Sequence, residues 1–196
     1  MADTVVASIG WERALMAGEK VKERLRRATK ALDDAGVPYA VVGGNAVAEW
    51  VARADEGAVR GTRDVDVLVH RADLAAARTA LEAAGFVYHH LLDVDMFIDG
   101  PQGRPSEAVH ILYAGEKVRP ESDHLLPDLD ESERAAEFQV TSLEALARMK
   151  LVSWRDKDRT HLRDMIGVGL IDATWPARFP PLLGDRLQQL LDTPNG

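Results

Sequence analysis

The chain has 196 residues and a formal net charge of −8, with 46% hydrophobic and 29% charged residues. These values are typical of a soluble globular protein with one core, or of one domain with a helical appendage. They argue against a protein that coats nucleic acid through a broad basic surface. The chain has no cysteine, which excludes disulfides, zinc–thiolate sites and thiol nucleophiles.

Charged residues are unevenly spread along the chain. Basic residues gather at 148–163, acidic residues dominate 121–137, and the first expected helix carries Lys20, Lys22, Arg24, Arg26, Arg27 and Lys30. The simplest interpretation of such runs is a solvated face. No apolar run approaches the roughly 20 residues of a membrane span, and the N-terminus lacks the features of a secretory signal. We therefore expect a cytoplasmic protein with no membrane partner.

Helices and strands alternate in the first part of the chain. Apolar residues at helical spacing, closed by Gly36-Val37-Pro38, predict a long first helix. The expected helices span 11–35, 45–54 and 72–84. The expected strands span 39–42, 64–69, 86–92, 94–98 and 108–113, with a turn at 100–103.

The second part of the chain is expected to be mostly helical. Its elements are a loop at 115–134, a short strand at 138–140 and helices from 142 onward, with breaks at 175–176 and 179–181. Mixed elements followed by helices predict an α/β (α+β) fold. We place an α/β domain at 1–140 and a helical C-terminal segment, packed on it, at 141–196.

Asp64 and Asp66 are the first candidates for chemistry. Residues two apart in a strand point to the same side, so both carboxylates share one face while Val65, Val67 and Val69 face the core. Neighbouring carboxylates repel, and one would bind a proton unless a cation lies between them. Mg²⁺ removes that conflict and prefers oxygen ligands. The alternative is an edge strand with a solvated outer face, although Asp is disfavoured within strands.

Gly43-Gly44 lies between a strand and a helix. Bare backbone N–H groups and a helix N-terminus then meet at one spot, which suits a phosphate. The run is neither a P-loop nor the dinucleotide-binding G-x-G-x-x-G pattern. The glycine pair alone is also compatible with an ordinary tight turn.

Val42-Gly43-Gly44, a helix, and Arg60-x-Thr62-x-Asp64-Val65-Asp66 form one composite pattern. It resembles the signature of the DNA polymerase β-like nucleotidyltransferase superfamily, and most closely the bacterial small nucleotidyltransferases and AbiE-type abortive-infection toxins. The resemblance implies a nucleotidyltransferase-type mixed β-sheet flanked by helices. It also implies Mg²⁺ or Mn²⁺ bound by Asp64 and Asp66, with an NTP as substrate.

Lys150 is the main candidate in the helical segment. Thr141-x-x-Glu144 is interpreted as a capping box, after which Lys150 falls on the apolar, inward face of a helix. A lysine there must extend outward to solvent or reach a buried anion. Met149-Lys150-Leu151 and Arg163-Asp164-Met165 also resemble a region of the AbiE-type proteins, which implies that Lys150 and Asp164 belong to the active site. Asp158 is a competing choice for the acid.

The superfamily usually supplies a third carboxylate from a later strand, and here Val109-His110-Ile111-Leu112 stands in its place. Histidine is a softer ligand and a poorer partner for Mg²⁺. His110 could instead act as a general base. Glu107, Asp93 or Asp95 could supply the acid from a neighbouring strand. The remaining interpretation is that the chemistry has been lost.

The sequence therefore predicts a metal-dependent nucleotidyltransferase that transfers NMP from an NTP to an acceptor hydroxyl of RNA (for example tRNA), a protein or a small molecule. The catalytic candidates are Asp64, Asp66, His110, Lys150 and Asp164, and the nucleotide-binding candidates are Gly43, Gly44, Asn45, Arg60 and Thr62. His110 motivates an alternative, a non-catalytic module that binds a partner. Family analogy adds a third hypothesis, a toxin with an antitoxin partner.

Overall fold

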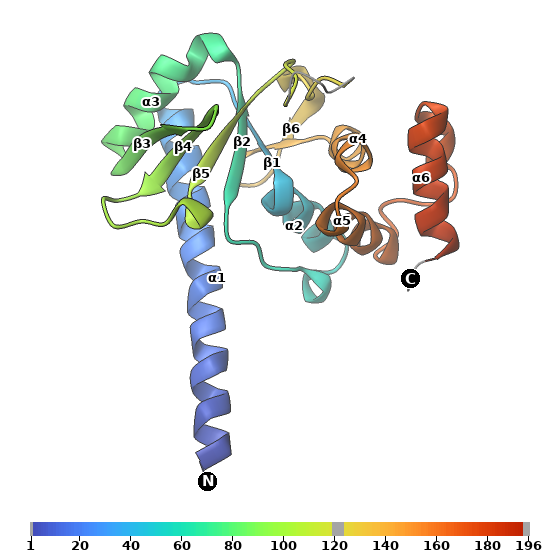
Figure 1. The fold of residues 1–196 in the computed structure, drawn as a ribbon, viewed down its shortest axis with the longest axis horizontal. Coiled ribbons are helices and arrows are strands. Elements are labelled where there is room, and N and C mark those ends of the chain that lie inside the picture. Colours follow the sequence, from blue (N-terminus) through green and yellow to red (C-terminus); the bar gives the residue numbers. More distant parts are fainter. Residues whose placement is uncertain (1, 119–123, 194–196) are drawn as a thin grey trace.

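A mixed seven-stranded β-sheet forms the centre of the protein in the computed structural model (Figure 1). The structure describes the backbone of residues 2–118 and 124–193, and the side chains of residue 12 and of residues 16 onward within these ranges. The strands are β1 (Ala40–Val42), β2 (Val65–Val69), β3 (Phe86–Leu91), β4 (Val94–Asp99), β5 (Val109–Tyr113), β6 (Ser132–Arg134) and β7 (Gln139–Thr141). Their order is β3-β4-β5-β2-β1-β7-β6.

The strand directions confirm the predicted mixed sheet. The pairs β2–β5 and β1–β7 are parallel, and the other neighbouring pairs are antiparallel. The α-helices are α1 (Ala2–Asp34), α2 (Gly43–Ala54), α3 (Leu74–Ala83), α4 (Leu143–Ser153), α5 (Asp156–Gly167) and α6 (Pro181–Asp192). No helix in the described part of the chain is long and apolar enough to cross a membrane.

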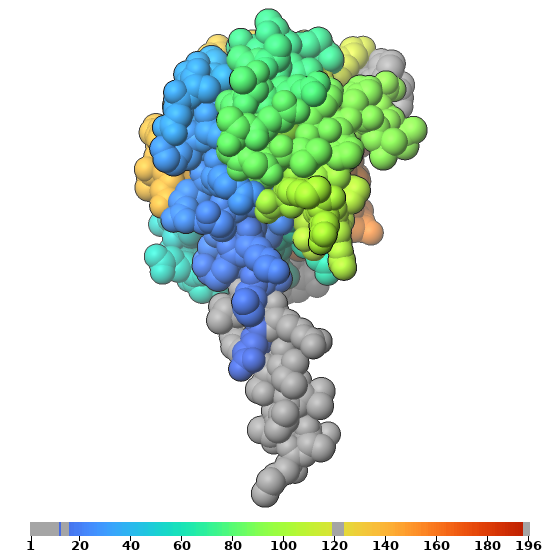
Figure 2. Space-filling view, turned by 90° about the vertical axis from the view of Figure 1, so that its left-hand side faces the viewer, coloured from blue at the N-terminus to red at the C-terminus, as the bar shows by residue number. Residues whose placement is uncertain are grey.

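Helices cover both faces of the sheet. Figure 1 shows α1 and α3 on one side, and α2, α4 and α5 on the other, with α6 outside them. The C-terminal part of α1 and the α3 region lie side by side on the face seen in Figure 2. The helices α4 and α5 thus lie on the side of the sheet opposite to α1, where they contact α2.

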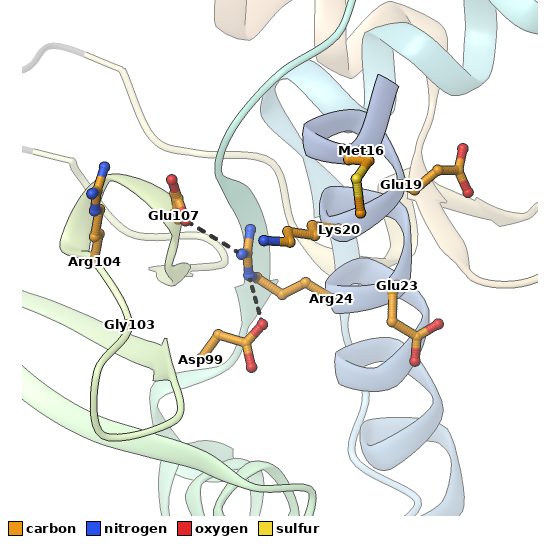
Figure 3. A pocket seen from close by; sticks show the side chains of 9 residues that line it. All are labelled: Met16, Glu19, Lys20, Glu23, Arg24, Asp99, Gly103, Arg104 and Glu107. Atoms are coloured by element: carbon orange, nitrogen blue, oxygen red, sulfur yellow. Dashed lines mark hydrogen bonds and ion pairs between the residues drawn. The ribbon is translucent and has the colours of Figure 1, made fainter. Parts of the chain in front are cut away.

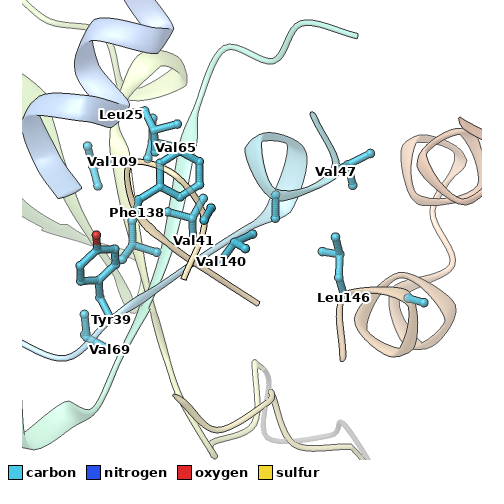
Figure 4. Packing of buried hydrophobic residues seen from close by; sticks show 14 of the residues in the cluster. Leu25, Tyr39, Val41, Val47, Val65, Val69, Val109, Phe138, Val140 and Leu146 are labelled. Carbon is cyan, nitrogen blue, oxygen red and sulfur yellow. The ribbon is translucent and has the colours of Figure 1, made fainter. Parts of the chain in front are cut away.

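The alternation expected for β2 is present in the core. Val65, Val67 and Val69 are fully buried, and Leu25 of α1 lies close to Val65 and Val109 (Figure 4). The intervening residue of β2, Asp66, is only partly buried and points to the opposite face of the sheet. One face of β2 is therefore wholly buried, whereas the other carries the partly buried Asp66 beside the buried Leu68.

Three local expectations need correction. The helix predicted over 11–35 begins earlier, at Ala2. The segment expected to be a loop at 115–134 contains β6, although its residues 119–123 lie outside the described part of the chain. The N-cap of α4 is Ser142, whose Oγ accepts from the Ala145 N–H. The predicted capping box at Thr141 was wrong because Thr141 still belongs to β7.

Candidate active site

Asp64, Asp66 and His110 come together at the junction of β2 and β5. These strands are parallel neighbours, and Asp66 stands directly opposite His110. His110 Nδ1 lies 3.5 Å from Asp66 Oδ1, and all three residues offer ligand atoms within 4.8 Å of one another. Two carboxylates suit Mg²⁺ or Mn²⁺, whereas the imidazole is a poorer ligand for Mg²⁺. Asp64 and Asp66 thus fit the metal that the sequence predicts, and His110 favours Mn²⁺ over Mg²⁺ if it binds as well.

Neighbouring residues shift the pKa values of Asp64 and His110 in this group. Burial tends to raise the pKa of Asp64, but the hydrogen bond from Thr62 Oγ1 (2.7 Å) and the nearby Lys157 and His110 lower it overall. The hydrogen bond to Asp66 raises the pKa of His110, against the opposing effect of burial. Asp64 is therefore ionised, and the group as a whole attracts positive charge.

The glycine pair allows the β1–α2 turn to approach the acids closely. Gly43 has a φ of +69°, and a Cβ there would lie 2.1 Å from Asp66 Oδ2. A Cβ on Gly44 would lie 2.8 Å from the Cβ of Thr62. Asn45 adds a hydrogen bond of 2.7 Å from its Nδ2 to the backbone oxygen of Asp64. No other residue type fits at Gly43 without displacing the Asp66 carboxylate.

A cavity of about 550 Å³ opens beside the acids. Its acidic side holds Asp64 and Asp66, next to the first turn of α2, whose N–H groups have no partner within the helix. The rest of its wall includes basic residues of the segment from α4 to α5, namely Arg148, Lys150, Arg155 and Lys157. The volume is within the range of small-ligand sites. Free N–H groups and cations around one cavity suit a polyphosphate.

The sequence predicts that Lys150 either extends to solvent or reaches a buried anion, and the structure shows the second arrangement. Its Nζ lies 3.3 Å from Asp158 Oδ1, and the two side chains are 8% and 0% exposed. Burial lowers the pKa of Lys150, against the attraction of Asp158. Burial opposes ionisation of Asp158 too, but Arg155 and Lys150 lower its pKa overall. The structure thus pairs Lys150 with Asp158, the competing choice, rather than with Asp164.

Arg60 and Asp164 form a separate pair. Arg60 Nε donates to Asp164 Oδ1 over 2.8 Å, and the Arg60 side chain is 66% exposed. Neither residue lines the cavity beside Asp64 and Asp66. The structure therefore does not bring this pair to the acids, and its roles in nucleotide binding and catalysis stay predictions.

The three alternative acids also lie away from Asp64 and Asp66. Asp95 stands opposite Ile111, so it points to the other face of the sheet from His110. There it accepts hydrogen bonds from the hydroxyls of two tyrosines. Glu107 faces α1, and Asp93 lies in the β3–β4 turn. His110 is thus the residue that β5 contributes to the group.

His161 of α5 lines the cavity and is not among the site residues that the sequence predicts. Burial and the nearby Lys150 lower its pKa to about 4, so the imidazole is neutral at pH 7. His161 follows Asp158 by three residues, and residues three apart lie on the same side of a helix. This spacing is the signal in the sequence that could have placed His161 beside Asp158.

The fold is that of a nucleotidyltransferase. The sequence pattern of the uncharacterised nucleotidyltransferase family matches residues 11–147, and the chain belongs to that family. No curated protein has a matching sequence.

Solved structures share the fold. An antigenic nucleotidyltransferase-like protein from Paracoccidioides brasiliensis is 19% identical, with a TM-score of 0.60 over 89% of this chain and 88% of that one. ANT(2'')-Ia, solved in complex with adenylyl-2''-tobramycin, is 17% identical, with a TM-score of 0.56 over 87% of this chain and 98% of that one. A solution structure of ANT(2'')-Ia, an antibiotic-resistance factor, gives a TM-score of 0.54 at 15% identity, over 89% of this chain and 92% of that one.

Proposed function

We propose that the protein transfers a nucleoside monophosphate from an NTP to an acceptor hydroxyl, with Mg²⁺ or Mn²⁺ held by Asp64 and Asp66. One observation carries this proposal: the two carboxylates share a cavity with a free helix N-terminus and a set of cations. A divalent cation bound between the carboxylates would neutralise phosphate charge and orient the α-phosphate.

The β- and γ-phosphates would bind at the start of α2. The N–H groups of Gly43, Gly44 and Asn45 lie there, and the glycines leave room for close approach. Lys150 extends from α4 into the same cavity and brings positive charge close to Asp66. Its pairing with Asp158 holds the ammonium group in place for a phosphate.

In the transfer itself the acceptor oxygen forms a bond to the α-phosphorus, the bond to the β-phosphate oxygen breaks, and pyrophosphate leaves. The proton of the hydroxyl passes to a base. His110 is our candidate, because its ring lies beside Asp66, at the edge of the proposed metal site, and an imidazole can accept a proton near neutral pH. Lys150 and the N–H groups of α2 would stabilise the charge on the leaving pyrophosphate.

Calorimetry with each of the four NTPs, with and without Mg²⁺ or Mn²⁺, tests the proposal. We expect metal-dependent binding of at least one NTP by the wild type, and its loss in the double variant Asp64→Asn/Asp66→Asn. The variant keeps the volume of both side chains, so a change in folding is readily separated from a change in binding. Unchanged metal-dependent binding in the double variant would refute the site.

A catalytically impaired binding module is the second candidate, and His110 in place of an acid is the observation that favours it. Incubation with α-labelled NTPs and candidate acceptors (tRNA, protein and small molecules) separates the two. Transfer of label to any acceptor eliminates the binding module. The AbiE-type likeness and an antitoxin partner stay predictions of the sequence, and growth arrest on expression would be their first test.

A further inference from the structure

Arg24 of α1 is buried, unlike several basic residues near it in the chain. Its side chain is 4% exposed, whereas Lys20, Lys22 and Arg26 are exposed. The sequence indicates one basic, solvated helix face, and Arg24 departs from that expectation. A buried guanidinium requires partners that compensate its lost hydration.

Three segments of the chain supply these partners (Figure 3). Arg24 Nη1 donates to the backbone oxygen of Arg63 over 3.1 Å. Its Nε donates to Asp99 Oδ2 over 3.3 Å, and its Nη2 lies 3.9 Å from Glu107 Oε2. Figure 3 shows the guanidinium between the Asp99 and Glu107 carboxylates, with dashed lines to both. One rigid, planar group thus contacts three separate segments.

Each of these segments leads to the candidate active site. Arg63 directly precedes Asp64, and Glu107 ends the short 3-10 helix Pro105–Glu107 just before β5, which carries His110. Asp99 ends β4, the antiparallel neighbour of β5. Arg24 therefore connects the entry of β2 to the entry of β5, at the point where the two strands bring the metal-binding candidates together.

Thr62 and Asn45 contact Asp64 itself, whereas the carbonyl group of the preceding residue, Arg63, is bound by Arg24. Thr62 binds the Asp64 carboxylate, and Asn45 binds its backbone oxygen. Residues 59–64 form no helix or strand, so ladder hydrogen bonds do not fix their path. Arg24 supplies a side-chain contact to this segment from α1, next to the backbone hydrogen bond from the Val65 N–H to the Ala108 oxygen, and its loss would remove the contact to the residue before Asp64.

We infer that Arg24 is a positioning residue, which holds the Asp64 carboxylate in place relative to Asp66 and His110 through its contacts with Arg63 and Glu107. The inference rests on the proposed metal-dependent transfer, because the spacing of ligands is what a metal ion senses. A cavity of about 680 Å³, lined by Arg24, Met16 and Gly103 among others, adjoins the guanidinium. Shorter or apolar side chains can therefore replace Arg24 without being forced into a full core.

Arg24→Met is the test variant, and Arg27→Met is its matched control. Arg27 lies one turn further along α1 and also pairs with Asp99, but it contacts neither Arg63 nor Glu107. We expect Arg24→Met to weaken Mn²⁺ binding about 10- to 100-fold, the range seen when residues behind metal ligands are replaced. Arg27→Met should bind Mn²⁺ as the wild type does. Electron paramagnetic resonance of free Mn²⁺ gives both affinities.

Arg24→Lys separates positioning from charge. A lysine keeps the charge, but its single ammonium group cannot span three acceptors, so we expect an Mn²⁺ affinity between wild type and Arg24→Met. Equal Mn²⁺ affinity in wild type and Arg24→Met would overturn the inference. If Arg24→Met does not fold, Arg24→Lys decides alone, and wild-type affinity in that variant overturns the inference.

The failure of the proposed function looks different. Wild type that binds no Mn²⁺ refutes the metal site without any variant. The positioning role is then measured from the His110 ring by NMR, with Arg27→Met as reference. A change in the His110 ring signals in Arg24→Met alone supports the role of Arg24, and unchanged signals overturn it.

Discussion

Replacing Gly43 by alanine challenges the close approach of the β1–α2 turn to the metal-binding candidates. Two effects add up at this position. A φ of +69° costs a residue with a Cβ about 1–2 kcal/mol. The new Cβ would also lie 2.1 Å from Asp66 Oδ2 and 2.9 Å from its Cγ, so the carboxylate must turn away.

Gly36→Ala is the control that contains only the first effect. Gly36 has a φ of +64°, and a Cβ there would meet nothing within 4 Å. Gly36→Ala should lose about 1–2 kcal/mol of stability, which lowers Tm by about 2–8 °C in a protein of this size. Gly43→Ala should lose more, because its Cβ also displaces the Asp66 carboxylate. Only Gly43→Ala should also lose Mn²⁺ affinity. We expect a loss of about 100-fold, because metal–oxygen distances near 2 Å tolerate little displacement.

Calorimetric titration of Mn²⁺ and thermal unfolding of both variants provide the readouts. Equal Mn²⁺ affinity in Gly43→Ala and Gly36→Ala would show that Asp66 either accommodates the methyl group or does not bind the metal. Either result would refute the role we give to Gly43. If both variants lost Mn²⁺ affinity, general destabilisation of the protein would be the cause instead.

Three further predictions follow from the same site. His110→Asp would complete a set of three carboxylates and should tighten Mg²⁺ binding in calorimetry; weaker binding would contradict the assignment of His110 to the metal group. Asp158→Asn would leave the buried Lys150 without its charged partner and should lower the free energy of unfolding in urea by about 3 kcal/mol, and a neutral effect would contradict their pairing. The pKa of His161 falls from 6.5 to about 4 on folding, so the unfolded chain binds the proton first, and stability should be lost as pH falls from 6.5 towards 4. Urea unfolding at pH 7 and at pH 5 gives the decrease in the free energy of unfolding between the two pH values, and this decrease should be smaller in His161→Gln than in wild type. Equal decreases in the two proteins would contradict the burial of this ring.

Local patterns in the sequence were sufficient for the sheet that carries the acids. The alternation of Val65, Asp66 and Val67 is a property of consecutive residues, and it predicted both the strand and its buried face. β6 was missed because its residues, Ser132 to Arg134, are polar and pair only with β7 at the edge of the sheet. Such a strand has no hydrophobic signal, since nothing covers it.

The partners of charged residues could not be read from the sequence in the same way. The partner of Lys150 depends on the path between α4 and α5, and that path turns at Trp154, which has a φ of +51°. A left-handed conformation is uncommon in a residue other than glycine, and the sequence does not indicate it. The burial of Arg24 depends on Asp99, 75 residues later in the chain. Only the assembled fold brings these groups together.

The two sides of the cavity have different origins in the chain. The family pattern ends at residue 147, so it contains Asp64, Asp66 and His110 but neither Lys150 nor α5. The acidic side of the cavity therefore comes from the part of the chain that the family pattern matches, whereas the basic residues of its wall, Arg148, Lys150, Arg155 and Lys157, all follow that part.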